Sequence, residues 1–416
     1  MPTTRAQKEW TVLVWMAGDN NLEDAGVDDL AELKQVGSTE DLDILVQLDR
    51  MSDQSTRRYH VRRGTSAQAD VVQELGPTNT GDPQCAIDFF TWGIQRCPAR
   101  RYLVVLWNHG SGIDESNVYD RVPRLGLRVS RRAQRTRGAV PLGRVHTAMS
   151  HGYRRALFST TVEAALRDRA IAYDDTARDF LDNMELKRVL LEVKKATGRR
   201  IDLVGFDACL MNMIELAYEL RGSTDFVVGS EETEPGDGWP YDTILAELAE
   251  NPRMTARELG SVIVQRYVES YPREEVTQSL LDLSKAPTVA EAVDVLATVL
   301  LKLIKTPEGL FAVNQAMRKT QAFAVRDFID LGDMVSQLLK QLKKANPALG
   351  EKVRAQLAKG PLGSFVVAEA HQGSTMQRAT GVSIYCPTPR SRVSVAYDRL
   401  AFAKKTRWDD FIQAYA

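Results

Sequence analysis

The stretch from Ile201 to Met211 constrains the possible folds of this chain more than any other part of it. Its apolar residues, interrupted by Gly205, have the length of one buried strand and lead directly to Cys209. Residues 212–220 then change to the apolar spacing of a helix. A buried strand followed at once by a helix is typical of an α/β protein, in which reactive groups gather at the carboxyl ends of the strands.

Cys209 therefore stands where a reactive thiol is expected. The amino terminus of a following helix favours the thiolate over the thiol. However, an unpaired cysteine in apolar surroundings is more often a small core residue, so a catalytic role requires a partner base. A second strand pattern, Tyr102 to Trp107, supplies one by leading to His109 and Gly110, where glycine lets a backbone N–H approach a substrate oxygen. Together the two strand ends indicate a cysteine–histidine pair.

The order of these motifs carries a resemblance to a known family. An apolar block that ends in His109-Gly110 precedes an apolar block that ends in Ala208-Cys209. On this pattern the chain resembles the clostripain family of cysteine peptidases, which shares a structural clan with caspases, gingipains, legumain and separase. Four further stretches resemble the family and extend from one end of the chain to the other: Trp15 to Leu22, Asp207 to Met211, Ser230 to Tyr241 and Gly381 to Pro387.

The resemblance implies a catalytic dyad, and we nominate no third residue. Cys209 would attack the scissile carbonyl to form an acyl-enzyme, and His109 would protonate the departing amine and then activate water. The backbone N–H groups of Gly110 and Cys209 would hold the oxyanion. Asp207 and Asp237 would line a pocket for Arg or Lys, since family members with these acids prefer basic residues at the bond cut. Without the resemblance, Asp207 is explained as a helix cap and Asp237 as a turn residue.

The alternation of strand and helix patterns predicts an α/β fold, and the resemblance makes it caspase-like, with a mostly parallel sheet flanked by helices. We expect a peptidase core over residues 1–284, a helical subdomain over 285–360, and C-terminal strands and a helix over 361–416 that rejoin the core. The predicted strands are 11–16, 42–48, 59–63, 102–107, 201–206, 225–229, 276–283, 363–369 and 381–385. The predicted helices are 22–36, capped by a turn at 19–21, and 82–96, 182–196, 212–220, 255–271, 289–304, 309–319 and 325–344.

A long basic insertion, residues 113–180, interrupts this alternation inside the predicted core. From Arg121 to Arg169 it holds twelve arginines, no lysine, and only Glu163 and Asp168 as acids. A solvated loop is the simplest interpretation, and an RNA-binding arm is a second one, although aromatic residues are few. Relatives cut themselves between their histidine and cysteine after a basic residue, so the resemblance implies a zymogen that processes itself in this segment.

Composition limits the partners that we expect. A net charge of −1 gives no overall field that attracts nucleic acid or an anionic membrane, so neither is predicted. The expected partner is a protein or peptide substrate with a basic residue at the cleavage site. Four sparse cysteines and the absence of a run as long as a transmembrane helix predict a cytoplasmic protein, while secreted relatives leave secretion open.

No metal site is predicted from the spacing of ligands. The four cysteines and five histidines are too scattered for a zinc site. Some relatives depend on calcium, which makes calcium the one candidate cofactor and brings Glu231 and Glu232 into consideration. No loop in the sequence, however, has the spacing of calcium ligands.

Three functional hypotheses remain open at this point. The first is a cysteine endopeptidase that cleaves after Arg or Lys. The second is a dedicated processing protease that cuts one partner protein. The third is a binding protein without catalysis, or an RNA-associated protein that uses the arginine-rich loop; the presence of both Cys209 and His109 counts against it.

Overall fold

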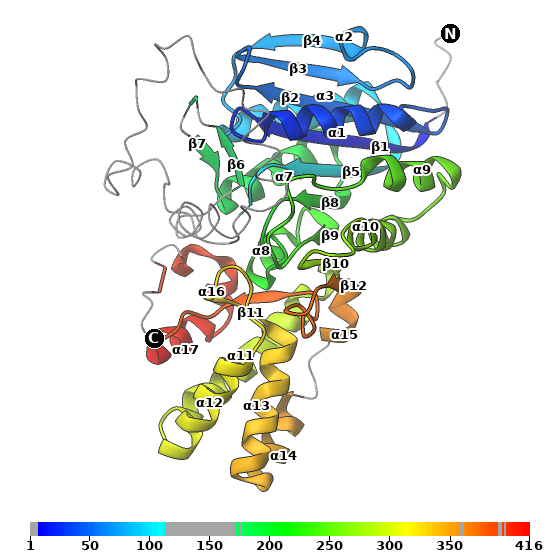
Figure 1. The fold of residues 1–416 in the computed structure, drawn as a ribbon. Coiled ribbons are helices and arrows are strands. Elements are labelled where there is room, and N and C mark those ends of the chain that lie inside the picture. Colours follow the sequence, from blue (N-terminus) through cyan, green and yellow to red (C-terminus); the bar gives the residue numbers. More distant parts are fainter. Residues whose placement is uncertain are drawn as a thin grey trace, which may run out of the picture.

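A nine-stranded sheet forms the centre of this computed structural model (Figure 1). The structure describes residues 7–110, 112, 171–174, 176–177, 179–357, 362–389, 393–394 and 397–416. The strands lie across the sheet in the order β12-β10-β9-β8-β5-β1-β2-β3-β4. Their bounds are β1 (Lys8–Gly18), β2 (Leu42–Arg50), β3 (Ser55–His60), β4 (Val71–Gly76), β5 (Ala99–Trp107), β8 (Ile201–Asp207), β9 (Thr224–Gly229), β10 (Val276–Asp282) and β12 (Val366–Gln372).

The five central strands are parallel, and the strands at both margins are antiparallel. β2, β1, β5, β8 and β9 run in one direction. β3 and β4 complete the sheet at one margin, and β10 and β12 complete it at the other. Parallel strands are buried on both faces, which explains their nearly continuous apolar sequences. We call the edge where the five parallel strands end the carboxyl edge, and the edge where they begin the amino edge.

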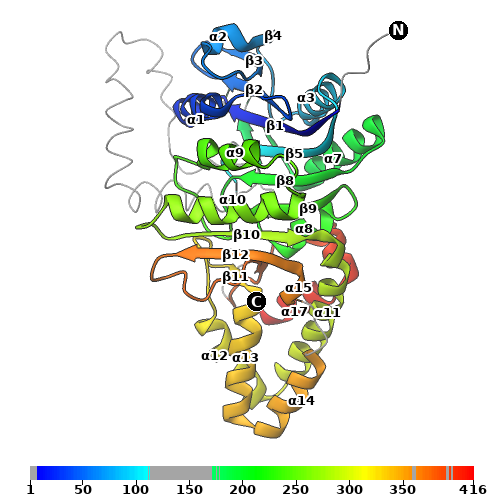
Figure 2. The same ribbon diagram turned by 90° about the vertical axis from the view of Figure 1, so that its right-hand side faces the viewer.

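Helices cover both faces of the sheet and create two apolar cores (Figure 2). The helices over one face are α1 (Glu23–Val36), α9 (Tyr241–Glu250) and α10 (Ala256–Ser270). Those over the other face are α3 (Pro83–Arg96), α7 (Asn183–Thr197) and α8 (Ile214–Leu220). This is the layered arrangement that an alternation of strands and helices predicts.

Further helices extend from the margin formed by β10 and β12 (Figure 1). They are α11 (Ala286–Leu303), α12 (Pro307–Lys319), α13 (Leu331–Ala345) and α14 (Pro347–Leu357). Their apolar side chains belong to the same core as those of α7 and α8. The chain then returns through α15 (Leu362–Phe365) to β12, which extends the main sheet as predicted, and ends in η4 (Tyr397–Arg399), α16 (Ala401–Lys405) and α17 (Trp408–Tyr415).

Most of the predicted elements are confirmed, and capping residues explain where several helices begin. Asp82 accepts a hydrogen bond from the backbone N–H of Gln84 at the start of α3, where Pro83 occupies the first turn. Asp182 and Glu185 form a capping box at the start of α7. These local signals are readable in the sequence because they require no distant partner.

Some predicted elements differ in extent or type from those in the structure. The strand predicted at 59–63 is instead β3, which is largely buried against β2; β4 and the short α2 (Ala67–Asp70) beyond it were not predicted. The helix predicted at 325–344 begins at Leu331, because β11 (Phe328–Asp330) pairs with β13 (Ser383–Tyr385) in a separate ladder. α9 was also not predicted.

Most of the predicted basic insertion, including all of its arginines, lies outside the described residues. Where the structure resumes, it shows a two-stranded hairpin of β6 (Ile171–Asp174) and β7 (Asp179–Leu181). No pattern in the sequence predicted this hairpin. The division of the chain at residues 285 and 361 stays a prediction.

Candidate active site

The ends of β5 and β8 bring His109, Gly110 and Cys209 together at the carboxyl edge. The two strands are parallel neighbours in which Trp107 pairs with Asp207, so His109 and Cys209 each lie two residues beyond paired positions. Gly110 lies against the cysteine, since a Cβ atom at this position would be 2.5 Å from the backbone oxygen of Cys209 and 2.9 Å from its nitrogen. Only glycine tolerates this approach.

His109 is half-buried and hydrogen-bonded to Asn21, which follows β1. Nε2 of the ring lies 2.9 Å from Oδ1 of Asn21. Because an amide oxygen only accepts, Nε2 carries the proton and Nδ1 is left as the basic nitrogen. Burial lowers the pKa of His109 to about 4, so the ring is neutral near pH 7. The sequence analysis did not assign a partner to His109, although Asn21 lies in a stretch that resembles the family.

The thiol of Cys209 is hydrogen-bonded to the loop that follows β9. The backbone N–H of Glu234 donates to Sγ over 3.2 Å. Burial raises the pKa of Cys209 to about 12, although the N–H groups of Glu234 and Gly110 oppose this shift. The expectation that a helix amino terminus stabilises the thiolate is wrong, because α8 begins only at Ile214 and Leu210 turns the chain with a φ of 64°. Near pH 7 these shifts favour a neutral thiol on Cys209 and a neutral imidazole on His109.

Asp207 belongs to a buried group of carboxyl side chains next to the cysteine. Its Oδ2 accepts hydrogen bonds from the hydroxyl of Tyr241 at 2.7 Å and from the N–H of Trp239 at 3.3 Å. Burial raises the pKa of Asp207 to about 6. Burial and the charge of Asp207 also raise the pKa values of Glu234 and Asp29 well above the usual range. Asp207 is therefore not a helix cap.

Asp237 is exposed and lies beside this buried group. A Cβ atom at the adjacent Gly238 would be 3.2 Å from both carboxylate oxygens of Asp207. Burial raises the pKa of Glu32 to about 7, and Asp242, Asp207 and Asp237 add to this shift. The two predicted pocket residues thus lie near each other. We call Asp29, Glu32, Asp207, Glu234 and Asp237 the acidic cluster.

Comparison with known proteins assigns the chain to a family. The sequence profile of the clostripain family matches residues 14–125 and 157–415, which is most of the chain. The chain belongs to the clostripain family. Clostripain of Hathewaya histolytica is 24% identical to it over 342 residues, which cover 69% of this chain and 55% of clostripain. The chain thus spans little more than half the length of that clostripain.

Two solved structures described as C11 proteases share the fold of this clostripain-family chain. A secreted C11 cysteine protease from Bacteroides thetaiotaomicron, in complex with an irreversible peptide inhibitor, aligns with a TM-score of 0.62 at 17% identity and covers 97% of this chain and 100% of that one. An inactive zymogen C11 protease from Parabacteroides distasonis aligns with a TM-score of 0.61 at 18% identity and covers 98% of this chain and 99% of that one. The predicted fold class is confirmed.

Two acids in the clostripain-like stretch 230–241 bind backbone groups rather than the site. Oε2 of Glu231 accepts a hydrogen bond from the N–H of Gly381 at 3.0 Å. Oε1 of Glu232 accepts hydrogen bonds from the N–H groups of Thr233 at 2.8 Å and Ala324 at 3.2 Å. Both acids therefore join the loop after β9 to the C-terminal part of the chain, and a calcium-related role for them stays a prediction.

The turn at 19–21 does not cap α1, contrary to the prediction. Leu22 is the N-cap residue, and its side chain forms no capping hydrogen bond. Asn20 accepts a hydrogen bond from the N–H of Leu22, whereas Asp19 accepts one from the hydroxyl of Thr176 at 2.8 Å. Together with the contact between Asn21 and His109, this makes the turn part of the carboxyl edge.

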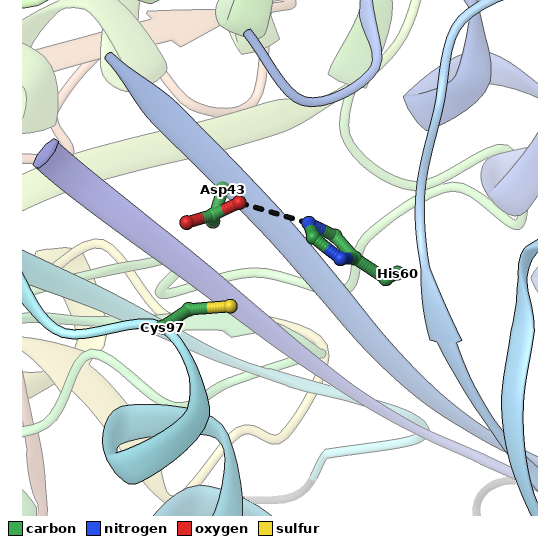
Figure 3. Close-up of side chains that lie close together, drawn as sticks. All are labelled: Asp43, His60 and Cys97. Carbon is green, nitrogen blue, oxygen red and sulfur yellow. Dashed lines mark hydrogen bonds and ion pairs between the residues drawn. The ribbon is translucent and has the colours of Figure 1, made fainter. Parts of the chain in front are cut away.

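The fold gathers a second set of chemically active side chains at the amino edge, where Asp43 lies between His60 and Cys97 (Figure 3). Oδ1 of Asp43 is 2.8 Å from Nε2 of His60 and 2.9 Å from Nζ of Lys8. Burial raises the pKa of Cys97 to about 12. The spacing of these residues did not suggest a cluster, because β2, β3 and the start of β5 meet only in the folded sheet. The ammonium group of Lys8 compensates the negative charge of Asp43, so Lys8, Asp43 and His60 form an ion-pair network in this clostripain-family chain.

Proposed function

We propose that this protein is a cysteine endopeptidase in which Cys209 and His109 form a catalytic dyad. The observation that carries this proposal is the pairing of β5 with β8, which sets His109 and Cys209 at adjacent strand ends with Gly110 against the cysteine. Membership of the clostripain family supports the same chemistry. A thiol and an imidazole in this relation are the groups that acyl transfer requires.

The neutral resting state determines the order of the chemical steps. As Sγ of Cys209 attacks the scissile carbonyl carbon, the thiol proton passes to the free ring nitrogen of His109. The imidazolium then gives this proton to the departing amine as the C–N bond breaks, which leaves an acyl-enzyme. His109 next takes a proton from water, whose oxygen attacks the acyl carbon, and returns this proton to Sγ as the C–S bond breaks, which releases the carboxylic acid and regenerates the thiol. Asn21 acts as a positioning residue because its amide holds the opposite ring nitrogen.

The backbone N–H groups of Gly110 and Cys209 would stabilise the oxyanion. The N–H of Gly110 already lies close enough to Sγ to lower the pKa of Cys209 against the effect of burial. A carbonyl carbon bound at Sγ would therefore place its oxygen near this donor. Removing such a donor typically lowers the rate on the order of 100-fold or more.

The acidic cluster supports a preference for Arg, and then Lys, before the bond that is cut. Burial raises the pKa values of Asp207, Glu234 and Asp29, and the charge of Asp207 adds to the shifts of Glu234 and Asp29. A substrate guanidinium would supply a positive charge and would pair with a carboxylate through two parallel hydrogen bonds. Asp237, at the exposed side of the cluster, would meet the same cation.

A panel of fluorogenic peptides tests the reaction and its specificity together. The peptides differ only in the residue before the leaving group, with Arg, Lys, citrulline, Leu and Asp as the variants. We expect hydrolysis in the order Arg, Lys and then the others, and none with Cys209→Ala. Hydrolysis of every peptide at one rate would remove the basic preference, and equal hydrolysis by Cys209→Ala would remove the dyad.

We also propose that the chain is a zymogen that cuts itself after an arginine between Arg121 and Arg169, a segment outside the described residues. β5 and β8 lie on either side of this segment in sequence and share one sheet, so the two products would stay together. Gel electrophoresis of freshly purified protein tests this proposal. Fragments that form as fast in Cys209→Ala as in the parent protein would show that another protease cuts the chain.

The alternatives make different predictions in the same experiments. A processing protease dedicated to one partner protein would leave all short peptides uncut and would cleave only that partner. A non-catalytic, RNA-associated protein would bind RNA through its arginine-rich segment, with an affinity that falls steeply with salt. Within the described residues, no helix is long and apolar enough to cross a membrane. A cytoplasmic location stays a prediction, and cell fractionation tests it.

A further inference from the structure

The loop that follows β9 lies beside the residues that carry the cysteine. The N–H of Leu210 donates to the backbone oxygen of Glu232 over 3.1 Å, and the N–H of Glu234 donates to Sγ of Cys209 over 3.2 Å. Glu232 thus contacts the residue after the nucleophile, and two positions later the same loop contacts the nucleophile itself. The position of Cys209 therefore depends on what holds Glu232.

The backbone of Leu210 makes this dependence stronger. Its φ of 64° lies in the left-handed region, which is uncommon for a residue other than glycine. Such a conformation persists only where the surrounding structure fixes it, and it is found most often at functional sites. The side chain of Leu210 is buried in the core, and its N–H is held by Glu232. Loss of this hydrogen bond would let the turn relax and would move Cys209.

The side chain of Glu232 is held in turn by a distant segment. It is 6% exposed, and its Oε1 accepts hydrogen bonds from the N–H of Thr233 at 2.8 Å and from the N–H of Ala324 at 3.2 Å. Ala324 lies between α12 and β11, next to Phe323, whose ring is buried in the core. Glu232 therefore connects the helical part of the chain to the loop of the cysteine.

The charge of Glu232 also acts on the cysteine. Burial raises the pKa of Glu232 to about 7, and the negative charge of Glu275 adds to this shift. The charge of Glu232 adds in turn to the rise in the pKa of Cys209. A buried acid that lies close enough to a nucleophile to affect its ionisation is typical of a functional site.

We propose that Glu232 is a positioning residue for the nucleophile. Its side chain anchors the loop at Ala324, and its backbone oxygen holds Leu210 in the left-handed turn. This keeps Sγ of Cys209 in its place next to the loop of His109. Because this role takes Cys209 as the nucleophile, the inference rests on the proposed function. It makes that function depend on the segment between α12 and β11, which contributes no catalytic group.

Glu215 on α8 is a matched control for Glu232. It is 0% exposed, and its Oε1 accepts hydrogen bonds from the N–H of Tyr385 at 2.9 Å and from the hydroxyl of Tyr397 at 3.1 Å. Burial raises its pKa to about 7 as well. Both acids thus bind the C-terminal part of the chain. A substitution at Glu215 therefore measures what the loss of such an acid costs in stability, without removing a contact to Leu210.

Activity and melting temperature of four variants test the positioning role. They are Glu232→Ala, Glu232→Gln, Glu215→Ala and Glu215→Gln, assayed with an arginine peptide, and a gel ensures that proteins in the same state of cleavage are compared. Glu232→Ala should lower kcat on the order of 10-fold at nearly unchanged KM, because a small displacement of a reacting group slows the reaction strongly. Glu232→Gln keeps an accepting oxygen and should restore most of kcat. Both Glu215 variants should lower only the melting temperature.

Alkylation of Cys209 by iodoacetamide tests the same link without a substrate. The reaction is run at pH 8.5, where Glu232 is largely ionised, and is followed by mass spectrometry of the peptide that contains Cys209. Glu232→Gln removes a negative charge near Sγ and should speed alkylation roughly 3-fold or more, because the thiolate fraction rises. Glu215→Gln should be alkylated at the rate of the parent protein.

The two measurements separate this inference from the proposed function. A parent protein that cuts no arginine peptide would count against the proposed function, and the alkylation rates would still decide the role of Glu232. Equal alkylation of Glu232→Gln and the parent protein would overturn that role. So would equal losses of kcat in Glu232→Ala and Glu215→Ala.

Discussion

Both edges of the central sheet contain buried aspartates, but the pKa values of these aspartates shift in opposite directions at the two edges. At the amino edge, burial acts to raise the pKa of Asp43, but hydrogen bonds and charge from His60 and Lys8 outweigh it and hold the pKa below its usual value. At the carboxyl edge, burial dominates and raises the pKa values of Asp49 and Asp207 to about 7 and about 6. At the amino edge, the fold itself supplies the cation for Asp43, which is Lys8.

This difference in pKa shifts indicates at which edge a positively charged ligand would bind. A carboxylate whose pKa is held low is already stabilised as an anion, and the fold gains from its charge. A buried carboxylate whose pKa is raised costs the fold free energy at neutral pH, and such a cost is typical of functional sites. The amino edge is therefore structural, and the carboxyl edge is where the substrate cation of the proposed peptidase would bind, beside Cys209.

The largest effect on activity should come from replacing the cysteine at each edge with alanine. Cys209→Ala removes the nucleophile, so we expect kcat/KM for an arginine peptide to fall by about 10⁴-fold or more. Cys97→Ala, at the amino edge, should keep the kcat/KM of the parent at a temperature where it is folded, with a lower melting temperature from the lost packing. An equal loss of activity in both variants would break the distinction between the edges.

Replacing a glycine at each edge with alanine should give the next largest difference in kcat. In Gly110→Ala the added Cβ meets the backbone of Cys209 at 2.5 Å, so the backbone must shift and the oxyanion donor moves with it. We expect kcat to fall on the order of 100-fold. Gly222, before β9 at the amino edge, has no atom within 4 Å of an added Cβ, and Gly222→Ala should leave kcat unchanged. Stopped assays with saturating arginine peptide measure both.

Neutralising one aspartate at each edge should affect specificity differently. Asp207→Asn removes a partner of the substrate guanidinium, so the preference for an arginine over a citrulline peptide should fall roughly 30-fold or more, equivalent to the ~2 kcal/mol that truncating one partner of a buried charge pair costs. Asp237→Asn, exposed, should lower it less. Asp43→Asn should leave the preference unchanged. A preference that survives in Asp207→Asn would place the recognition of the basic residue elsewhere.

The smallest effect concerns stability, and its sign should differ between the edges. Because the pKa of Asp43 is lowered in the folded state, its contribution exists above the unfolded pKa of about 3.8 and is lost as the pH falls further. Asp43→Asn should therefore destabilise the protein at pH 7 by about 1–3 kcal/mol, through unpaired Lys8 and His60, and should approach the stability of the parent below pH 4.

Asp207 should show the opposite dependence. Its pKa is raised from 3.8 to about 6, so the stability associated with it is present below pH 4 and is lost as the pH rises toward 6. Relative to the parent, Asp207→Asn should gain stability between pH 4 and pH 7, a change shared with Glu234 and Asp29 because the three titrate together. Urea unfolding at pH 4, 5, 6 and 7 measures both variants, and curves that shift in the same direction would contradict the comparison.

Much of the fold was readable in the sequence because its signals are local. The capping residues of α3 and α7 and the apolar runs of the central strands need no distant partner. β11 was missed because its pairing with the remote β13 defines it, whereas β3 and the hairpin of β6 and β7 were misplaced or missed because their short sequences carry little apolar alternation. The reactivity expected for Cys209 from a helix amino terminus failed for a related reason, since the path of the chain from Leu210 to Met213 delays α8.

The sequence by itself determined the strand–helix alternation, the order of His109 and Cys209, and the motifs that relate the chain to the clostripain family. Only the tertiary structure decided that Asn21 holds the histidine and that Glu234 and Asp29 stand beside Asp207. The physical reason is that hydrogen bonds and charge interactions act over a few ångströms. Residues about 30 to 180 positions apart in the chain enter that range only when the sheet brings the ends of its strands to one edge.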